Sequence, residues 1–196
     1  MTKKKKQEKE IITFPDKYIV VGGDISLKRP GFAMMYVEKE NGIATIKDLK
    51  TTSTDNKKDT KKCHGELLND ILRTMAFFFP DEEKINIPVY YVKEKYINAT
   101  SSMNEQNVAK AVGISDWLLF HMNHEWTNIY PTTIKKLVTG NGKATKEDVA
   151  LALHFYVGDR EYANDDESDA VAVCIAFLIQ NNEIKQIIEE GNENAK

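Results

Sequence analysis

The sequence predicts an α/β fold built on a mixed five-stranded sheet, with three antiparallel strands followed by a parallel β-α-β arrangement and helices at its sides. Two patterns predict it: short apolar runs rich in β-branched residues, and a later alternation of such runs with helical periodicity. The chain of 196 residues is 41% hydrophobic and 29% charged, as in ordinary globular proteins. We expect one well-packed domain.

The first three predicted strands lie close together in the sequence. Residues 18–24 read YIVVGGD, a short apolar run typical of a buried central strand. Residues 31–37 form a second such run, and a turn ending at Gly42 leads to a third, at 43–49. This spacing predicts an antiparallel meander.

Strands and helices alternate in the rest of the chain. Residues 62–79 carry apolar side chains at helical spacing before Pro80, and residues 87–94 form a fourth strand. A Ser-x-x-Glu capping box at Ser102 opens a helix that runs to about His121. The other predicted elements are a fifth strand at 126–130 and helices near 132–137, 145–156 and 168–180. Three antiparallel strands followed by this alternation are the ribonuclease-H-like order.

The two ends of the chain differ from the predicted domain at 17–180. Residues 1–16 contain a lysine run and little periodicity, so we expect a flexible basic arm. Residues 181–196 form an acidic C-terminal tail. Within the tail, three isoleucines suggest a short amphipathic helix: Ile184, Ile187 and Ile188.

Composition argues against several classes of protein. No apolar run approaches the length of a membrane span, and the N-terminus lacks the apolar core of a signal peptide. Cys63 and Cys174 have no CxxC partner and are interpreted as buried thiols, without disulfides or structural zinc. The four histidines make no convincing metal set. We therefore expect a cytoplasmic protein, in the host cytoplasm if a virus or phage encodes it.

The charge distribution is more informative than the net charge of -3. Residues 130–146 contain lysines and no acidic residue, whereas residues 147–169 are strongly acidic. The lysines of the basic segment are Lys135, Lys136, Lys143 and Lys146. A nuclease needs lysines that bind phosphates beside carboxylates that bind cations, and this distribution suits that function. Two oppositely charged solvated faces explain the charges equally well.

Two carboxylates end predicted strands. Asp24 closes the first strand and Glu94 the fourth. If these strands are parallel neighbours, their ends place the two carboxylates side by side, where they repel each other unless a cation lies between them. A turn-capping role for Asp24, and surface ion pairs of Glu94 with Lys93 and Lys95, are the structural alternatives.

Asp166 and Asp169 are three residues apart at the start of the last predicted helix, on one helical face. Acidic residues at a helix N-terminus are also ordinary capping residues. Together with Asp24 and Glu94 they suit Mg²⁺, or alternatively Mn²⁺, because these hard cations prefer oxygen ligands. Two such ions in one site would support in-line phosphodiester hydrolysis without a side-chain nucleophile.

Four segments, in order, resemble motifs of the RuvC family of Holliday-junction resolvases, particularly its bacteriophage and poxvirus branches. Residues 23–33 (GDISLKRPGFA) are similar to the first motif, and residues 94–102 (EKYINATSS), with Gly113 later, to the second. Residues 140–149 (GNGKATKEDV) and 166–172 (DESDAVA) resemble the remaining two. The resemblance runs from about residue 18 to 177.

The resemblance implies that Asp24, Glu94, Asp166 and Asp169 are the metal-binding catalytic residues. It implies that Lys135 and Lys146 contact DNA or the scissile phosphate, and we expect Lys136 and Lys143 to add DNA contacts. It also implies a symmetric homodimer that nicks two opposed strands of branched DNA. The helix at 102–121 is the expected dimer contact, with plain core packing as its alternative.

One position departs from the family pattern. The family often has a base-stacking aromatic residue three positions after the second-motif glutamate, where this chain has Ile97, preceded by Tyr96. Either side chain could wedge between bases, and preference for four-way junctions over forks or flaps could be relaxed. A ribonuclease H acting on RNA–DNA hybrids is the alternative of the same fold, and a fragment of an actin-like ATP-binding fold is the alternative of another class.

Overall fold

The structure, a computed structural model, describes residues 13–54, 63–96 and 103–187. Its centre is a five-stranded sheet of order β3-β2-β1-β4-β5. The strands are β1 (Lys17–Asp24), β2 (Gly31–Glu40), β3 (Ile43–Ser53), β4 (Val89–Glu94) and β5 (Thr127–Ile129). β1, β2 and β3 are antiparallel, whereas β4 is parallel to both β1 and β5. The predicted fold class is confirmed.

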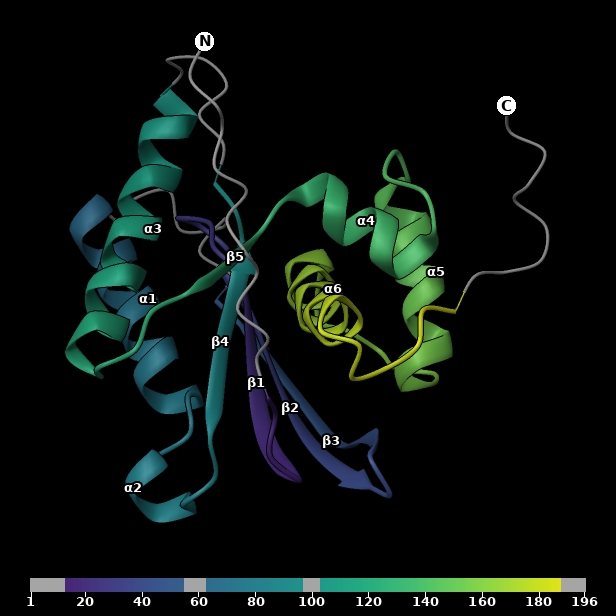
Figure 1. Ribbon diagram of the computed structural model, residues 1–196. Coiled ribbons are helices and arrows are strands. Elements are labelled where there is room, and N and C mark those ends of the chain that lie inside the picture. Colours follow the sequence, from purple (N-terminus) through teal and green to yellow (C-terminus); the bar gives the residue numbers. More distant parts are fainter. Residues whose placement is uncertain (1–12, 55–62, 97–102, 188–196) are drawn as a thin grey trace, which may run out of the picture.

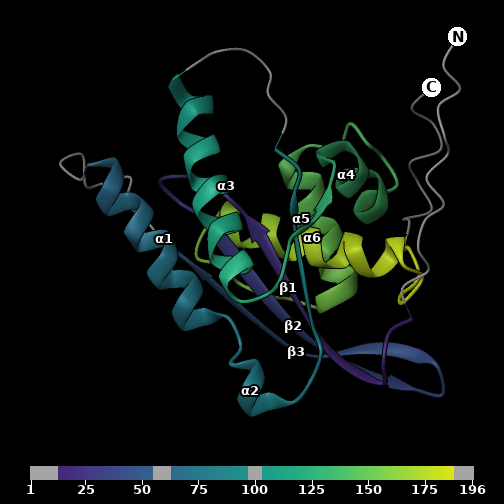
Figure 2. The same ribbon diagram turned by 60° about the vertical axis from the view of Figure 1, so that its left-hand side comes forward.

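Helices cover both faces of the sheet (Figure 1). On one side lie α1 (His64–Phe78), the short α2 (Glu82–Ile85) and α3 (Met103–His121). On the other lie α4 (Pro131–Thr139), α5 (Lys146–Val157) and α6 (Asp165–Gln180). Figure 2 shows α1 and α3 side by side over the sheet. No helix in these described ranges has the length and apolarity of a membrane span.

The central strand β1 is apolar from Tyr18 to Gly23 because both of its faces are covered there. Tyr18 and Val20 point into a core beneath α6, and Ile19 and Val21 point into a second core beneath α1 and α3. Helix α6 supplies much of the first core, since every residue from 170 to 179 is buried. A helix that is apolar all round needs neighbours on every side. It lies between the sheet and helices α4 and α5.

Residues on either side of the predicted domain at 17–180 also pack against it. Phe14, assigned to the flexible arm, is buried against Tyr18 and Tyr90. Glu183, assigned to the acidic tail, accepts hydrogen bonds from the Tyr18 hydroxyl at 2.7 Å and the Lys39 ammonium at 2.8 Å. Residues 184–187 form no helix, contrary to the prediction, because Glu183 and partly buried Ile184 hold this segment against the domain. Ile188 lies outside the described residues.

Several local predictions also need correction. α6 begins at Asp165, three residues earlier than predicted, because the Asn164 side chain accepts a hydrogen bond from the Glu167 amide and caps it. Cys63 is exposed at the N-cap of α1, although it was expected to be buried; Cys174 is buried, and both thiols are free. The capping residue Ser102 lies outside the described residues.

Candidate active site

The ends of β1 and β4 bring the first two predicted carboxylates together. The strands are parallel neighbours, with Gly23 paired to Lys93, so Asp24 and Glu94 follow at the same sheet edge. Both side chains line a cavity of about 310 Å³, together with Asp169 of α6. The rest of its lining is Pro131, Ile134, Lys135, Lys146, Val149 and Ala172. Three of the four predicted carboxylates therefore face one cavity.

Helix α6 reaches this edge because two glycines leave room for it. A Cβ atom at Gly22 would lie 2.4 Å from Cys174 Sγ and 2.5 Å from the Ala170 carbonyl oxygen. A Cβ atom at Gly31 would lie only 2.0 Å from the carbonyl oxygen of Asp166. The backbones of β1 and β2 thus touch the first turns of α6 directly. This contact sets Asp166 and Asp169 beside Asp24.

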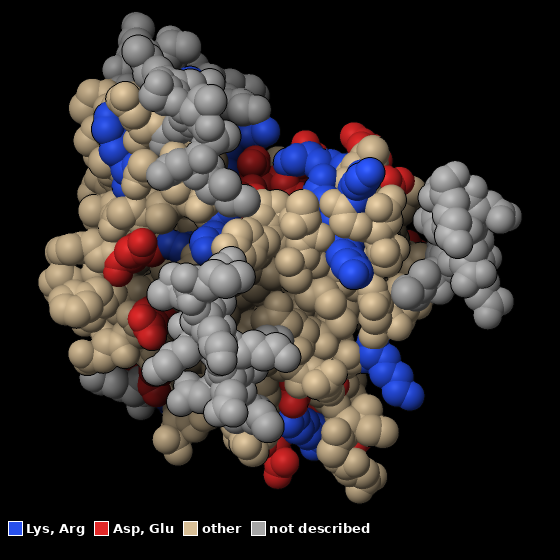
Figure 3. All heavy atoms as spheres, turned by 45° about the horizontal axis from the view of Figure 1, so that its top comes forward, with Lys and Arg blue, Asp and Glu red and all other residues tan. Residues whose placement is uncertain are grey.

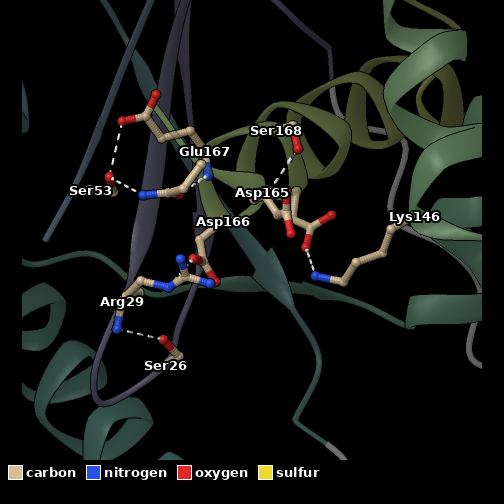
Figure 4. A network of polar contacts seen from close by, with 10 residues as sticks. Ser26, Arg29, Ser53, Lys146, Asp165, Asp166, Glu167 and Ser168 are labelled. Atoms are coloured by element: carbon tan, nitrogen blue, oxygen red, sulfur yellow. Dashed lines mark hydrogen bonds and ion pairs between the residues drawn. The ribbon is translucent and has the colours of Figure 1, made fainter. Parts of the chain in front are cut away.

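Glu167 fastens the start of α6 to the edge strand β3. Its buried carboxylate accepts hydrogen bonds from the hydroxyls of Thr51 at 2.9 Å and Ser53 at 3.1 Å, and from the Ala163 amide at 3.2 Å. Figure 4 shows Glu167 on the side of the helix turned toward Ser53, while Asp166 lies near Arg29. Glu167 is thus a structural carboxylate, in contrast to Asp166 and Asp169 on the same helix.

The gathered carboxylates repel one another. Burial, and then the negative charges of Asp169, Glu94 and Asp166, raise the pKa of Asp24 to about 8, against the opposing effect of Lys146. Partial burial of its carboxyl, and then Asp169, also raise the pKa of Glu94, although this residue ends β4 at an exposed position. A bound cation would relieve this repulsion.

Two basic side chains compensate the acids of α6. Lys146 Nζ lies 2.5 Å from Asp169 Oδ2, and Arg29 Nε lies 3.0 Å from Asp166 Oδ2. Burial opposes the charge of Lys146, but its hydrogen bond to Asp169 and the charge of Asp24 outweigh this and raise its pKa. As the side chains lie, no group of three His, Cys, Asp or Glu residues in the described ranges could hold a metal ion. The donor chemistry fits a hard divalent cation, but loading requires the carboxylates to turn toward it.

The predicted DNA-binding residues do not all lie at the cavity. Lys135 and Lys146 line it, and Lys135 Nζ donates a 2.6 Å hydrogen bond to the Ala144 carbonyl. Lys136 and Lys143 are exposed and stand outside its lining. Figure 3 shows acidic side chains sunk between basic ones on this face of the molecule. Such a surface admits a phosphate backbone while keeping carboxylates beneath it.

A second cavity, of about 380 Å³, shares Asp24 and Glu94 and is also lined by Tyr96 and Lys95. Ile97 lies outside the described residues. The sequence indicates Lys95 only as an ion-pair partner of Glu94, and it does not predict Arg29 as a site residue. The position of Lys95 next to a strand-ending glutamate was the available signal, whereas nothing local in the sequence marks Arg29 as a partner of Asp166.

Comparisons with known proteins agree with this geometry. The sequence model of the family described as "Crossover junction endodeoxyribonuclease RuvC" matches residues 20–177. A protein of that name from Rickettsia typhi is 30% identical over 166 residues, covering 82% of this chain and 97% of the relative. The one from Rickettsia bellii (strain OSU 85-389) is 31% identical over 172 residues, covering 84% and 99%.

Solved structures show the same fold. Thermus thermophilus RuvC superposes with a TM-score of 0.61 at 18% identity, covering 84% of this chain and 96% of its own. Its complex with a Holliday-junction substrate gives a TM-score of 0.62 at 20% identity, covering 87% and 99%. Assignment to a bacteriophage or poxvirus branch stays a prediction. The family match and the bacterial relatives establish that this chain belongs to the RuvC family of crossover junction endodeoxyribonucleases.

Proposed function

We propose that this chain is a metal-dependent, structure-selective endonuclease that cleaves Holliday junctions and other branched DNA, such as forks and flaps. The observation that carries the proposal is the meeting of carboxylates from β1, β4 and α6 at one cavity rimmed by Lys135 and Lys146. The RuvC family is one of metal-dependent nucleases, and Thermus thermophilus RuvC has been solved in complex with a Holliday-junction substrate.

We assign the metal-binding role to Asp24, Glu94, Asp166 and Asp169. Mg²⁺ is the proposed ion, with Mn²⁺ as the alternative and two ions in each site. Divalent cations held there would supply Lewis acidity, which lowers the pKa of water and stabilises the departing 3′ oxygen. The chain's own contribution is positioning: two strand ends fix Asp24 and Glu94, and the glycine contacts fix the two aspartates of α6.

The proposed DNA contacts lie around the cavity. Lys135 and Lys146 are suited to a phosphate near the carboxylates because both already line the same space. Tyr96, in the adjoining cavity, is suited to stacking on an unpaired base. Lys136 and Lys143 are exposed and would contact the backbone further from the site.

The proposal includes a homodimer, for which α3 offers a surface. Trp117 is 50% exposed and Phe120 is 75% exposed, whereas Ala111 and Leu119 are buried in the core. The helix thus combines core packing with an outward apolar face. Phe77 of α1, in the same helical layer (Figure 1), is also exposed, at 86%. Phe120→Asp should shift the protein to a monomer in sedimentation velocity, with Phe155→Asp on α5 as the control. A dimer that survives Phe120→Asp would place the contact elsewhere.

A cleavage assay tests the function directly. The full chain is incubated with a four-way junction, a fork, a linear duplex and an RNA–DNA hybrid of matched sequence, with Mg²⁺ or with EDTA. We expect Mg²⁺-dependent cutting of the junction at symmetric positions and little cutting of the linear duplex. Equal cutting of the hybrid without preference for branches would favour a ribonuclease H. ATP hydrolysis without DNA cleavage would favour the actin-like alternative.

We also propose that the protein works in the cytoplasm. The division into a basic arm, a nuclease domain and an acidic tail is retained as a proposal. We include Phe14 and Glu183 in the nuclease domain because both contact it.

A further inference from the structure

We propose that Arg29 is a positioning residue that withholds Asp166 from divalent cations until a DNA phosphate draws the guanidinium away. In the DNA-free protein the site would then take one divalent ion, bound by Asp24, Glu94 and Asp169. The second ion would load only with the substrate. This inference rests on the proposed function and concerns how the same site is filled.

The four carboxylates are not equivalent. Asp24, Glu94 and Asp169 line the 310 Å³ cavity, whereas Asp166 is absent from its lining. Asp166 instead pairs with Arg29, whose Nε lies 3.0 Å from Asp166 Oδ2. Three acids are therefore presented to the cavity, and the fourth is held by a basic side chain of the β1–β2 loop.

The Arg29–Asp166 pair is more secluded than the neighbouring Lys146–Asp169 pair. The Arg29 and Asp166 side chains are 23% and 14% exposed, against 59% and 25% for Lys146 and Asp169. Ion pairs away from water are screened less by solvent and salt. Arginine also stays charged at every accessible pH, so loss of a proton cannot release Asp166.

The loop that carries Arg29 is fixed against α6. The Arg29 amide donates a 3.1 Å hydrogen bond to Ser26 Oγ, which shapes the turn (Figure 4). Gly31, two residues later, contacts the Asp166 backbone so closely that a Cβ atom would overlap its carbonyl oxygen. One hydrogen bond within the loop and one close backbone contact between Gly31 and Asp166 thus hold Arg29 within reach of Asp166.

Release of Asp166 needs another anion for the guanidinium. A DNA phosphate is a strong candidate because arginine binds phosphate oxygens through two parallel hydrogen bonds. Arg29 belongs to the loop that directly follows Asp24, and the first residues of this loop, Ile25 and Ser26, line the second cavity. DNA binding and loading of the second ion would then be coupled through one side chain.

Calorimetric titration of MnCl₂ into the full, metal-free chain without DNA tests this. We expect one site in the wild type. Arg29→Gln should show a second site. Removing the charge-assisted pair should raise the Mn²⁺ affinity of this second site about tenfold or more above its value in the wild type, where it is too weak to be titrated. Arg29→Lys should keep one site. Lys28→Gln is the matched control, because it changes the same charge at an exposed neighbouring residue.

Junction affinity measured in EDTA gives an independent readout. Arg29→Gln should weaken binding several-fold and lower the salt slope by about one phosphate contact, whereas Lys28→Gln should change binding less. Thermal unfolding confirms that each variant is folded. Two Mn²⁺ sites in the DNA-free wild type, or a folded Arg29→Gln variant that gains no site, overturn the inference. If the wild type meanwhile cuts junctions, the proposed function stands; if it neither cuts them nor binds Mn²⁺, both proposals fail.

Discussion

Replacing Asp24 by asparagine tests two effects separately: the stability that the buried carboxyl group costs the fold, and the cleavage activity that it supports. Burial and the three neighbouring carboxylates raise the pKa of Asp24 from 3.8 to about 8. At pH 7 without metal, the folded protein therefore keeps a proton that the unfolded chain releases. Because the folded pKa is the higher one, the free energy of unfolding falls as pH rises from about 4 to about 8.

The size of this effect follows from the distance between pH 7 and the unfolded pKa of 3.8. It corresponds to about 4 kcal/mol of lost stability, at 1.36 kcal/mol for each pH unit. Asparagine keeps the shape and cannot ionise, but its amide is still withdrawn from water. We therefore expect Asp24→Asn to gain about 2–4 kcal/mol in EDTA at pH 7 and close to nothing at pH 4.

Urea unfolding followed by circular dichroism, in EDTA at pH 4, 7 and 8.5, measures the difference. The same variant should cut no junction DNA. In EDTA it should bind the junction as tightly as the wild type at pH 7, where Asp24 is protonated, and more tightly at pH 8.5, where the wild-type carboxylate is ionised and repels the phosphate. A stability difference that does not change with pH would refute the electrostatic reasoning. Loss of binding together with cutting would make Asp24 a structural residue.

Three further substitutions test the site. Lys146→Ala should weaken junction binding and reduce its salt dependence by about one phosphate contact, and an unchanged slope would remove this lysine from the interface. Gly31→Ala should cost roughly 1–3 kcal/mol of stability and most of the cleavage activity, because the new Cβ displaces α6 at Asp166. Gly113→Ala, with nothing within 4 Å of its Cβ position, is its control in the same unfolding assay. Glu167→Ala should leave Thr51 without its buried partner and lower kcat more than junction affinity. Glu167→Gln should recover part of the loss, and equal activity of the two variants would argue against this role of Glu167 in holding α6 to β3.

The sequence alone determined the sheet and two of its catalytic candidates. Strand β1 was predictable because a β-branched apolar run without alternation indicates burial on both faces. The apolar run stops at Asp24, which predicts the end of the strand. Glu94 followed by the same reasoning at β4, since parallel neighbours end at one edge. These inferences depend on local pattern and topology, which a linear sequence contains. The four-residue α2 and the cap at Asn164 escaped prediction because single turns carry too little periodicity.

Contacts between distant segments were decided only by the tertiary structure. Acidic residues 165, 166, 167 and 169 look alike in the sequence, yet the packing of α6 turns Glu167 toward β3 and Asp169 into the cavity. The pairing of Arg29 with Asp166 joins a loop to a helix far away along the chain, and it exists because Gly31 lets the two backbones meet. Side-chain roles of this kind depend on how closely distant segments approach each other, which composition and spacing do not encode.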